Sequence, residues 1–425
     1  MQTFKYPTPQ EWGPLTERAV SNQQAVMETV RPILEAVKQR KDQAVKEFTE
    51  RFDGVRIENM AVSETEIKNG CLKVDSQLKD AINTARLNIQ KFHENQKQPV
   101  RKVETAPGVV CWQRSEAIEK VGLYIPGGSA PLFSTVLMLA VPAVVAGCKD
   151  IVLCSPPDKN GKIHPAVLLA AHLSGIDKIF KVGGAQAIAA MGYGTESIPK
   201  VDKIFGPGNS YVTAAKQLIS LEGTAIDLPA GPSEVLVMAD ESAEADFVAS
   251  DLLSQAEHGP DSQAILVTTS ESLIAQTGKE IENQLASLPR AEVTKKALEH
   301  SRIILLKNID EMIDFSNQYA PEHLILSVRD YHTAAERIRN AGSVFLGNYT
   351  PESAGDYASG TNHTLPTYGY AKAYSGVGLD SFCKKITFQE ISPKGLKKLG
   401  PVIETMAAAE HLDAHKMAVS LRVKK

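Results

Sequence analysis

Four short apolar runs decide the fold: VGLYIP at residues 121–126, DIVLCSPP at 150–157, KIFKVGG at 178–184 and KIFGPGN at 203–209. Between them lie longer segments with helical spacing, at residues 137–147, 166–175 and 214–223. Such alternation is typical of βαβ units around a parallel sheet. After AGPSEVLVMAD (230–240) a second series follows, with QAILVTT, RIILLK, HLILSV and SVFLGN as its strands. Its helices are expected near residues 242–257, 271–286, 309–318 and 331–340.

The two series therefore predict an α/β protein with two parallel sheets. Paired α/β units usually leave a crevice between them, and ligands there prefer the carboxyl ends of the strands. Up to about residue 100 the chain is rich in Lys, Glu and Gln, with apolar residues at amphipathic helical spacing. The tail from about Ser381 is expected to be helical again, either packed on its own body or reaching a second subunit.

Composition restricts the candidate functions. The chain has 425 residues, 46 Lys plus Arg and 50 Asp plus Glu, a net charge of −4 and no long basic run. Nucleic acid and membrane are therefore not expected as partners. The N-terminus MQTFKYPTPQEW lacks a signal peptide's basic and apolar regions. Five cysteines without C-x-x-C spacing predict reduced thiols in a cytoplasmic protein, with neither a disulfide frame nor a zinc cluster.

Histidine and carboxylate residues gather in three remote segments framed by Gly and Pro. In SQAEHGPDSQA (254–264), Gln255 and His258 stand three residues apart at the end of a predicted helix, so they share one face. The other segments are PESAGDYASGTNHTLPTYGY (351–370) and AAAEHLDAH (407–415). A single histidine near a helix end is more often a capping or surface residue. The three segments together favour half of a metal site at Gln255 and His258, completed by the other two.

The segment Pro321-Glu322-His323 offers two proton-transfer groups at the start of a predicted strand. Adjacent strand residues point to opposite faces, so both groups share a site only if the chain bends there, which the proline favours. From the dipeptide alone, a solvated Glu and a core His is the favoured interpretation. In the tail, Glu410 and His415 share a site only if the helix breaks around residues 412–414, and His411 is expected at the surface.

Glycine-rich turns occur three times, in YIPGGSA (124–130), VGGAQAIAAMGYG (182–194) and FGPGNSYVTAAK (205–216). Each lets backbone N–H groups face an anion at a helix N-terminus, as dinucleotide phosphates require. None is G-x-G-x-x-G, because Tyr211 stands where the third glycine would be. Tight strand-to-helix turns need glycine in any case, so the turns alone do not separate a binding role from a structural one.

Taken in order, these segments resemble the histidinol dehydrogenase family over nearly the whole chain. The resemblance implies a four-electron oxidation of L-histidinol to L-histidine through histidinaldehyde, with two NAD⁺ and a zinc ion. It also implies a homodimer whose C-terminal tail crosses over, so that each site uses both chains. Two incomplete Rossmann-like domains are implied, with small terminal segments. The division expected is 1–19, then 20–123 with 235–377 (metal and catalytic residues), 124–234 (NAD side), and 378–425.

Carried over by position, the resemblance implies a role for each site residue. Glu322 and His323 would be the acid–base pair. The zinc ligands would be Gln255, His258, Asp356 and His415. The substrate would contact those four residues, His323, and additionally Ser233, His363 and Glu410. NAD would contact Tyr124, Gln186 and Asn209. Two alternatives stay open from the residues themselves: a metal-dependent hydrolase with Glu322 as base, and a non-catalytic small-molecule binding protein with two α/β lobes.

Overall fold

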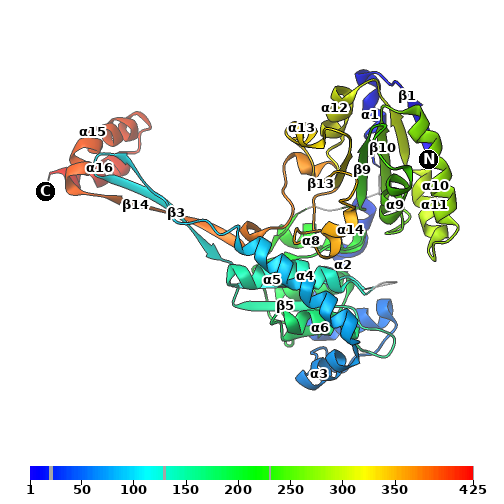
Figure 1. Cartoon of the computed structure of the whole chain (residues 1–425). Helices are drawn as coiled ribbons and strands as arrows, with labels where there is room; N and C mark the ends of the chain where they lie inside the picture. Colours follow the sequence, from blue (N-terminus) through cyan, green and yellow to red (C-terminus); the bar gives the residue numbers. More distant parts are fainter. Residues whose placement is uncertain (19–22, 128–130, 229–230, 425) are drawn as a thin grey trace.

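The computed structural model describes residues 1–18, 23–127, 131–228 and 231–424. It contains two parallel sheets with helices on both faces and a third, antiparallel sheet that extends from the body as an arm (Figure 1). The α/β class and both parallel sheets are as predicted. Part of the first glycine-rich turn, residues 128–130, lies outside the described residues, as do residue 230 of the 230–240 segment and residues 19–20 at the expected domain boundary.

A five-stranded parallel sheet forms one lobe, in the order β6-β5-β4-β7-β8. One face is covered by α5 and α6, with α3 and α4 packed outside them, and the other face by α7, α8 and α2. The strands are β4 (Lys120–Tyr124), β5 (Asp150–Ser155), β6 (Lys178–Lys181), β7 (Lys203–Phe205) and β8 (Ala225–Ile226). The helices are α2 (Gln23–Asp53), α3 (Glu64–Lys73), α4 (Ser76–Glu94), α5 (Phe133–Ala146), α6 (Pro165–Leu173), α7 (Gly184–Tyr193) and α8 (Ser210–Ser220).

A six-stranded parallel sheet forms the other lobe, in the order β1-β11-β10-β9-β12-β13. Helices α9, α10 and α11 cover one face, and α1, α12 and α13 the other. The strands are β1 (Gln2–Lys5), β9 (Glu234–Ala239), β10 (Gln263–Thr268), β11 (Arg302–Leu305), β12 (His323–Ser327) and β13 (Ser343–Leu346). The helices are α1 (Trp12–Leu15), α9 (Ala245–Ala256), α10 (Glu271–Leu285), α11 (Ala291–Glu299), α12 (Ile309–Tyr319), α13 (Tyr331–Ala335) and α14 (Glu352–Tyr357). The strands and helices expected for the second series are confirmed, although the last helix covers only Tyr331–Ala335 of the expected 331–340. Helices α11 and α14 were not predicted.

The N-terminal helices pack on the lobe opposite to the one expected. We grouped residues 20–123 with 235–377, but α2 lies against α7 and α8, α3 against α6, and α4 against α5. Strand β4, which ends the expected range, pairs with β5 and β7 in the five-stranded sheet. The apolar stripes of these helices fit either sheet by composition, so only tertiary contacts decide the grouping. Strand β1, in the expected terminal segment, joins the six-stranded sheet beside β11.

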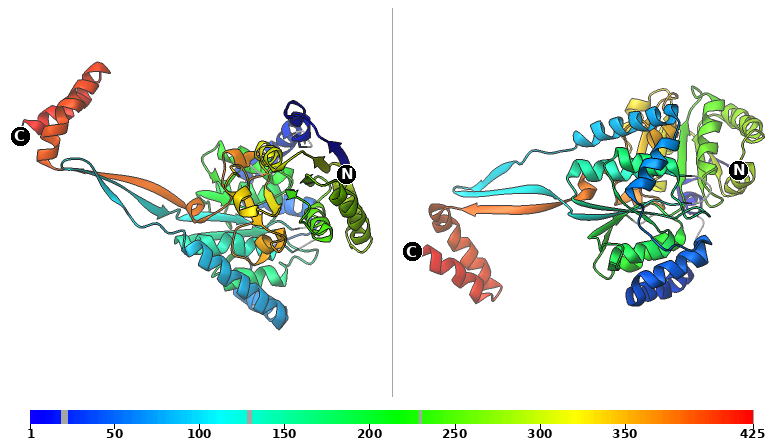
Figure 2. Two further views of the ribbon diagram at one scale, coloured as in Figure 1. Left: turned by 45° about the horizontal axis from the view of Figure 1, so that its top comes forward. Right: turned by 90° about the horizontal axis from the view of Figure 1, so that it is seen from below.

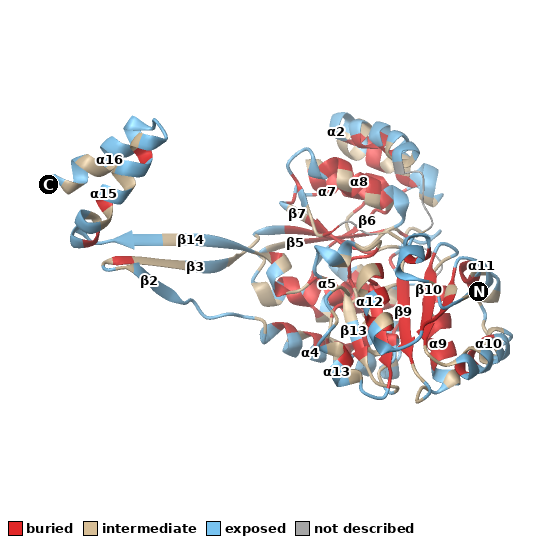
Figure 3. Cartoon of the chain, turned by 90° about the horizontal axis from the view of Figure 1, so that it is seen from above, coloured by how far each residue is buried: buried red, intermediate tan, exposed pale blue. Residues whose placement is uncertain are grey.

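The arm consists of β2 (Lys102–Ala106), β3 (Val109–Ala117) and β14 (Cys383–Ile391), followed by α15 (Pro393–Ala409) and α16 (Asp413–Val423). It projects away from both lobes in every view (Figures 1 and 2). We expected a helical tail, but its first part is strand β14, which pairs antiparallel with β3. Trp112 of β3 stacks on Phe388 of β14, with ring centroids 5.4 Å apart. The arm is mostly exposed, whereas most strands of both parallel sheets are buried (Figure 3).

Two expectations from composition can be compared with the structure. All five cysteines are free, and Cys154 is the one that is fully buried, while the others are partly exposed. Among the described residues, no helix combines the length and the apolar character that crossing a bilayer requires.

Candidate active site

A cleft of about 560 Å³ lies between the two lobes and contains most of the predicted site residues. The five-stranded sheet contributes Pro126 after β4 and Pro207–Asn209 after β7, at the carboxyl ends of its strands. The six-stranded sheet contributes residues at the amino ends of β9 and β12 instead, which corrects our expectation of carboxyl ends for this lobe. The predicted residues that line the cleft are Asn209, Ser233, His258, Glu322, His323, Asp356 and His363.

Glu322 and His323 lie in the same cleft because the chain bends just before them. Helix α12 ends at Ala320 in the left-handed conformation (φ 54°), Pro321 follows, and regular strand β12 begins only at His323. The Nδ1 atom of His323 lies 3.6 Å from a carboxylate oxygen of Glu322. Both side chains are almost completely buried. The arrangement puts a carboxyl and an imidazole side by side on the floor of the cleft.

Burial and neighbouring charges shift the pKa values of both groups. Burial raises the pKa of Glu322 to about 8, although His323 acts in the opposite direction. Burial on its own would lower the pKa of His323, but the carboxylates of Glu352, Glu322 and Asp356 outweigh it and raise that pKa well above its ordinary value. A carboxyl group with a pKa near neutrality suits general acid–base chemistry.

The backbone of Glu234, the first residue of β9, holds both groups in place. Its N–H donates to a carboxylate oxygen of Glu322 at 2.9 Å, and its carbonyl oxygen lies 3.3 Å from His323 Nδ1. Its own side chain is buried and forms a two-point ion pair with Arg18, at 2.7 and 2.8 Å. Arg18 also donates to the carbonyl of Tyr319 at 2.8 Å and lies over its ring at 3.7 Å. The N-terminal segment thus supports the floor of the cleft indirectly.

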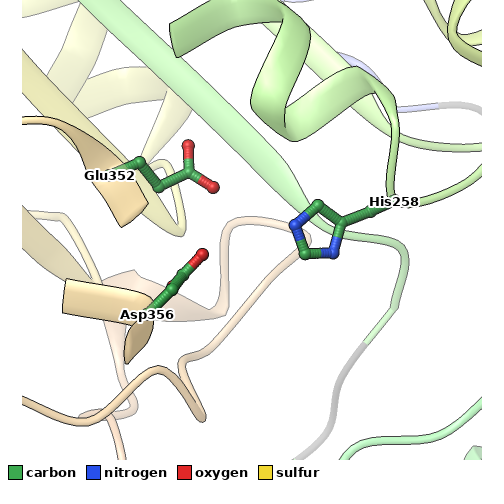
Figure 4. Close-up of side chains that lie close together, drawn as sticks. All are labelled: His258, Glu352 and Asp356. Atoms are coloured by element: carbon green, nitrogen blue, oxygen red, sulfur yellow. The ribbon is translucent and has the colours of Figure 1, made fainter. Parts of the chain in front are cut away.

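His258, Glu352 and Asp356 form the candidate metal centre within one chain. Each offers one ligand atom, and these atoms all lie within 4.8 Å of one another. In Figure 4 the two carboxylates, both from α14, lie on one side of a gap that faces the His258 ring just after α9. Burial raises the pKa of Glu352 to about 8 and lowers the pKa of His258. A positive ion between them would reverse the cost of burying these carboxylates.

Gln255 is a further candidate ligand near the end of α9. It is completely buried, and neither its amide oxygen nor its amide nitrogen has a hydrogen-bond partner. One carboxylate oxygen of Glu352 is also buried without a partner. Buried polar groups nearly always have partners, so these unpartnered atoms fit a region of the protein that binds a cation or a polar ligand.

His363 connects the two lobes across the cleft. Its Nδ1 atom lies 3.0 Å from the backbone carbonyl of Asp356, and its Nε2 atom lies 3.2 Å from the Thr135 hydroxyl on α5. Both ring nitrogens are therefore engaged in this state, and burial lowers the pKa of the ring. Ser233 lines the cleft just before β9, next to the Glu234 support.

A second cavity, of about 850 Å³, opens at the carboxyl ends of the five-stranded sheet. It contains Tyr124, Gln186 and Asn209, the three residues expected to contact NAD. The Tyr124 hydroxyl accepts from the Gly184 N–H at 3.1 Å, and both amide atoms of buried Gln186 have no partner. Asn209 caps α8, accepting from the N–H groups of Tyr211 and Val212. The cavity and the cleft share Pro126 and Asn209, so the two spaces adjoin.

The two predicted site residues of the tail lie far from the cleft of their own chain. Glu410 and His415 are exposed on the arm, where Glu410 ends α15 and His415 lies in α16 (Figure 1). The helix does break between them, at residues 410–412, slightly earlier than expected, and His411 is exposed at φ 59°. The structure of one chain brings Gln255, His258 and Asp356 to the same region but leaves His415 outside it.

Glu352 was not among the site residues predicted from the sequence. It lies four residues before Asp356, so both carboxylates share one face of α14, and this i, i+4 spacing was the available signal. Glu234 and Arg18 were missed as well. They are 216 residues apart in the chain, and neither has a local motif that indicates their pairing.

The chain has two α/β lobes, a cleft with a buried carboxyl–imidazole pair, and an adjoining cavity at strand carboxyl ends. These features indicate a two-lobed α/β enzyme with two neighbouring ligand spaces. A family model described as histidinol dehydrogenase matches residues 16–423. The chain is 61% identical to the histidinol dehydrogenase of Bacteroides thetaiotaomicron over 423 residues, covering 100% of this chain and 99% of the relative. It is 54% identical to that of Escherichia coli, covering 96% and 94%.

A solved structure supports the same assignment. The crystal structure of histidinol dehydrogenase from Elizabethkingia anophelis is 55% identical, covers 100% of this chain and 98% of that one, and superposes with a TM-score of 0.98. The chain therefore belongs to the histidinol dehydrogenase family, which makes it an oxidoreductase of histidine biosynthesis.

Proposed function

We propose that this protein oxidises L-histidinol to L-histidine through L-histidinaldehyde, using two NAD⁺ and a zinc ion, as the last step of histidine biosynthesis in the cytoplasm. Family membership supports the substrate and the reaction class. The observation that carries the proposal is the buried Glu322–His323 pair in a cleft that adjoins a dinucleotide-sized cavity. An alcohol-to-acid oxidation needs both spaces, because hydride must pass between substrate and cofactor.

The donors around the cleft suit a zinc ion. Zinc binds imidazole nitrogen and carboxylate or amide oxygen, and the unsatisfied amide of buried Gln255 lies in the helix that leads to His258. We assign Gln255, His258, Asp356 and His415 of a second copy as its ligands. When bound, the ion would supply a positive centre that orients the imidazole and amine of histidinol. Glu352 would then add negative charge beside it.

The acid–base pair divides the two oxidations. His323 accepts the hydroxyl proton of the alcohol in the first step. The carboxylates of Glu352 and Asp356 raise the pKa of its ring, so a cation that compensated their charges would lower this pKa and leave the ring neutral and able to accept the proton. Glu322 activates the water that adds to the aldehyde before the second hydride leaves. Its pKa of about 8 keeps a useful fraction in the basic form near neutrality, while burial makes that form a stronger base.

The remaining predicted residues orient the two organic molecules. Ser233 and His363 line the cleft and would contact the substrate, together with Glu410 of a second copy. Tyr124, Gln186 and Asn209 would contact NAD. The unpartnered amide of Gln186 supports a polar ligand in that cavity. Holding alcohol and nicotinamide in line converts hydride transfer into an effectively unimolecular step.

A homodimer with exchanged tails accounts for Glu410 and His415. Both lie on an arm that extends away from the cleft of its own chain, so they can complete a site only on another copy. The arm helices also expose large apolar side chains that a second subunit would cover, including Val402, Met406, Met417 and Leu421. The proposed partner is therefore a second copy of this chain, with two shared sites per dimer.

One assay tests the reaction directly. L-histidinol and excess NAD⁺ should give growth of NADH absorbance, about two NADH per histidinol as the redox balance requires, and a strong chelator should abolish it. The hydrolase alternative, with Glu322 activating water on an ester or amide, predicts no NADH at all. The binding-protein alternative predicts histidinol binding without turnover. Either of those results would reject the proposal.

A further inference from the structure

Asp53, the last residue of α2, carries a carboxylate that nothing in the proposed chemistry uses. It lines the 850 Å³ cavity beside Tyr124, and its Oδ2 atom is buried without a hydrogen-bond partner. Burial raises the pKa of this carboxyl to about 6, so it is largely ionised at neutral pH at a cost to stability. A buried, unpartnered acceptor in a cavity calls for a donor from a ligand.

The other carboxylate of the cavity is already engaged. Asp158 is exposed and accepts from the backbone N–H groups of Asn160 and Lys162, at 2.8 and 2.9 Å. Its oxygen closes a local turn, as aspartates commonly do. The two carboxylates therefore differ, because Oδ1 of Asp158 is used by its own loop, whereas the buried Oδ2 of Asp53 receives no hydrogen bond from the described residues.

The position of Asp53 selects one half of a dinucleotide. The nicotinamide end must reach Glu322 and His323 in the cleft, which joins the cavity at Pro126 and Asn209. Asp53 and its neighbour Phe52 line the cavity but not the cleft, so they meet the other, adenosine, half. Phe52 is 51% exposed and offers an apolar face there.

The chemistry of adenosine restricts what Asp53 can bind. An ionised carboxylate only accepts hydrogen bonds, so it suits ribose hydroxyls or the adenine amino group and repels a phosphate. Elsewhere, an acidic residue that accepts from the ribose 2′-hydroxyl favours NAD over NADP, whose 2′-phosphate occupies that place. Here the glycine fingerprint that usually accompanies such an acid is absent, and Asp53 comes from a helix N-terminal to the whole sheet.

We propose that Asp53 accepts a hydrogen bond from the ribose hydroxyl groups on the adenosine side of NAD and thereby excludes NADP. This inference rests on the proposed use of a nicotinamide dinucleotide in this cavity. It adds the residue that decides which dinucleotide is used.

Fluorescence titrations of NADH and NADPH measure this selectivity without turnover. Wild-type protein should bind NADH more tightly than NADPH. Asp53→Asn should weaken NADH binding about tenfold, as expected for one hydrogen bond to a charged group, and should reduce the NADH-to-NADPH ratio of affinities by a similar factor. Glu50→Gln is the matched control, because it removes one exposed carboxylate from the same helix outside the cavity and should change neither affinity. Thermal melting verifies that Asp53→Asn stays folded, which removal of a buried charge favours.

Three outcomes would contradict the proposed role of Asp53. One of them does so without affecting the proposed use of NAD. An unchanged affinity ratio in Asp53→Asn would exclude a role in selectivity while leaving NAD use intact. Reduced nicotinamide hypoxanthine dinucleotide lacks the adenine amino group. If Asp53→Asn bound this analogue as tightly as wild type does, Asp53 would be assigned to the base and not to the ribose. Failure of wild-type protein to bind either NADH or NADPH would overturn the dinucleotide site itself, and with it the proposed oxidation.

Discussion

Glu322 and His323 are neighbours in the chain, yet the proposed mechanism gives them separate steps. Glu322→Gln keeps the shape of the side chain and removes the base that activates water, whereas His323 still accepts the alcohol proton. We expect the variant to retain much of the histidinol-to-aldehyde half-reaction and to lose oxidation of added histidinaldehyde by roughly 10²–10⁴-fold. Single-turnover NADH formation from each substrate measures the two steps separately.

The control for that variant is Glu241→Gln, an exposed carboxylate whose ion pair with Arg329 lies on the surface. It should leave both half-reactions unchanged. If Glu322→Gln lowered the rates of both half-reactions equally, Glu322 would not act specifically in aldehyde oxidation. The proposed division of roles between Glu322 and His323 would then be rejected.

His258 supplies the imidazole of the candidate metal centre. Among the described residues, no hydrogen bond of its ring explains its place beside Glu352 and Asp356. His258→Asn should therefore reduce the zinc content of purified protein to a small fraction of one ion per chain, because a ligand is lost. Elemental analysis after dialysis gives the result. His172→Asn, an exposed histidine of α6 in the other lobe, should keep its metal. A full complement of zinc in His258→Asn would exclude this residue as a ligand.

Local sequence could predict which side chains matter but not all of their contacts. Pro321 signalled the bend that lets Glu322 and His323 share the cleft, and the bend occurs at Ala320. The role of Glu234 was not predictable in this way, because its backbone supports both groups through contacts between distant strands. Such support depends on sheet register, in which His323 pairs with Val235, and register follows from tertiary packing.

The segment before α2 supports β9 through the Arg18–Glu234 ion pair, which is nearly excluded from solvent. Removing one partner leaves a buried charge without compensation, so Arg18→Met should lower the free energy of unfolding by about 3–5 kcal/mol. It should also lower kcat more than it raises KM, because Glu234 holds Glu322 and His323 and is outside direct reach of the substrate. Urea unfolding and steady-state kinetics measure both effects.

The double variant Arg18→Met/Glu234→Gln tests whether the stability lost in Arg18→Met comes from the unpaired charge of Glu234. It removes the unpaired charge and should recover part of the stability lost in Arg18→Met. Arg329→Met breaks the exposed pair with Glu241 and should cost little. If the double variant were less stable than Arg18→Met, the loss would come from packing and not from charge.

Elements with a strong period were predictable, and those that depend on a distant partner were not. The strands at 263–268 and 323–327 matched their apolar runs almost residue for residue. Strand β14 was missed because KKITFQEI lies on an exposed arm and gains its structure from pairing with β3. The placement of α2 was wrong for a related reason, since an amphipathic stripe does not identify the sheet that it covers.

The shape of the molecule, with an arm held away from two compact lobes, implies that function is completed between copies (Figure 2). If tails exchange, a chain with Glu322→Gln and a chain with His415→Asn inactivate different parts of a site. In a mixed dimer one site then contains both lesions and the other contains neither. Refolding or co-expressing the two inactive variants should restore about a quarter of wild-type activity, as random pairing in a two-fold dimer gives.

Activity in this experiment is the formation of L-histidine from L-histidinol, because Glu322→Gln still releases NADH in the first oxidation. By this measure each variant alone should be inactive. Size-exclusion with light scattering should show that the mixture and the wild type have the mass of two chains. Activity near zero in verified mixed dimers would show that each chain uses its own tail, and the exchange of tails would be rejected. Full activity of His415→Asn alone would show that His415 is not needed.

We infer that side chains from the middle of the chain, the late loop and a second copy's tail hold one zinc ion in each cleft. Anomalous scattering at the zinc edge, from crystals of the zinc-loaded protein, locates that ion. We expect one peak per cleft, bounded by Gln255, His258 and Asp356 of one chain and His415 of another. A peak held by His258, Glu352 and Asp356 of a single chain, with His415 remote from it, would exclude this set of ligands.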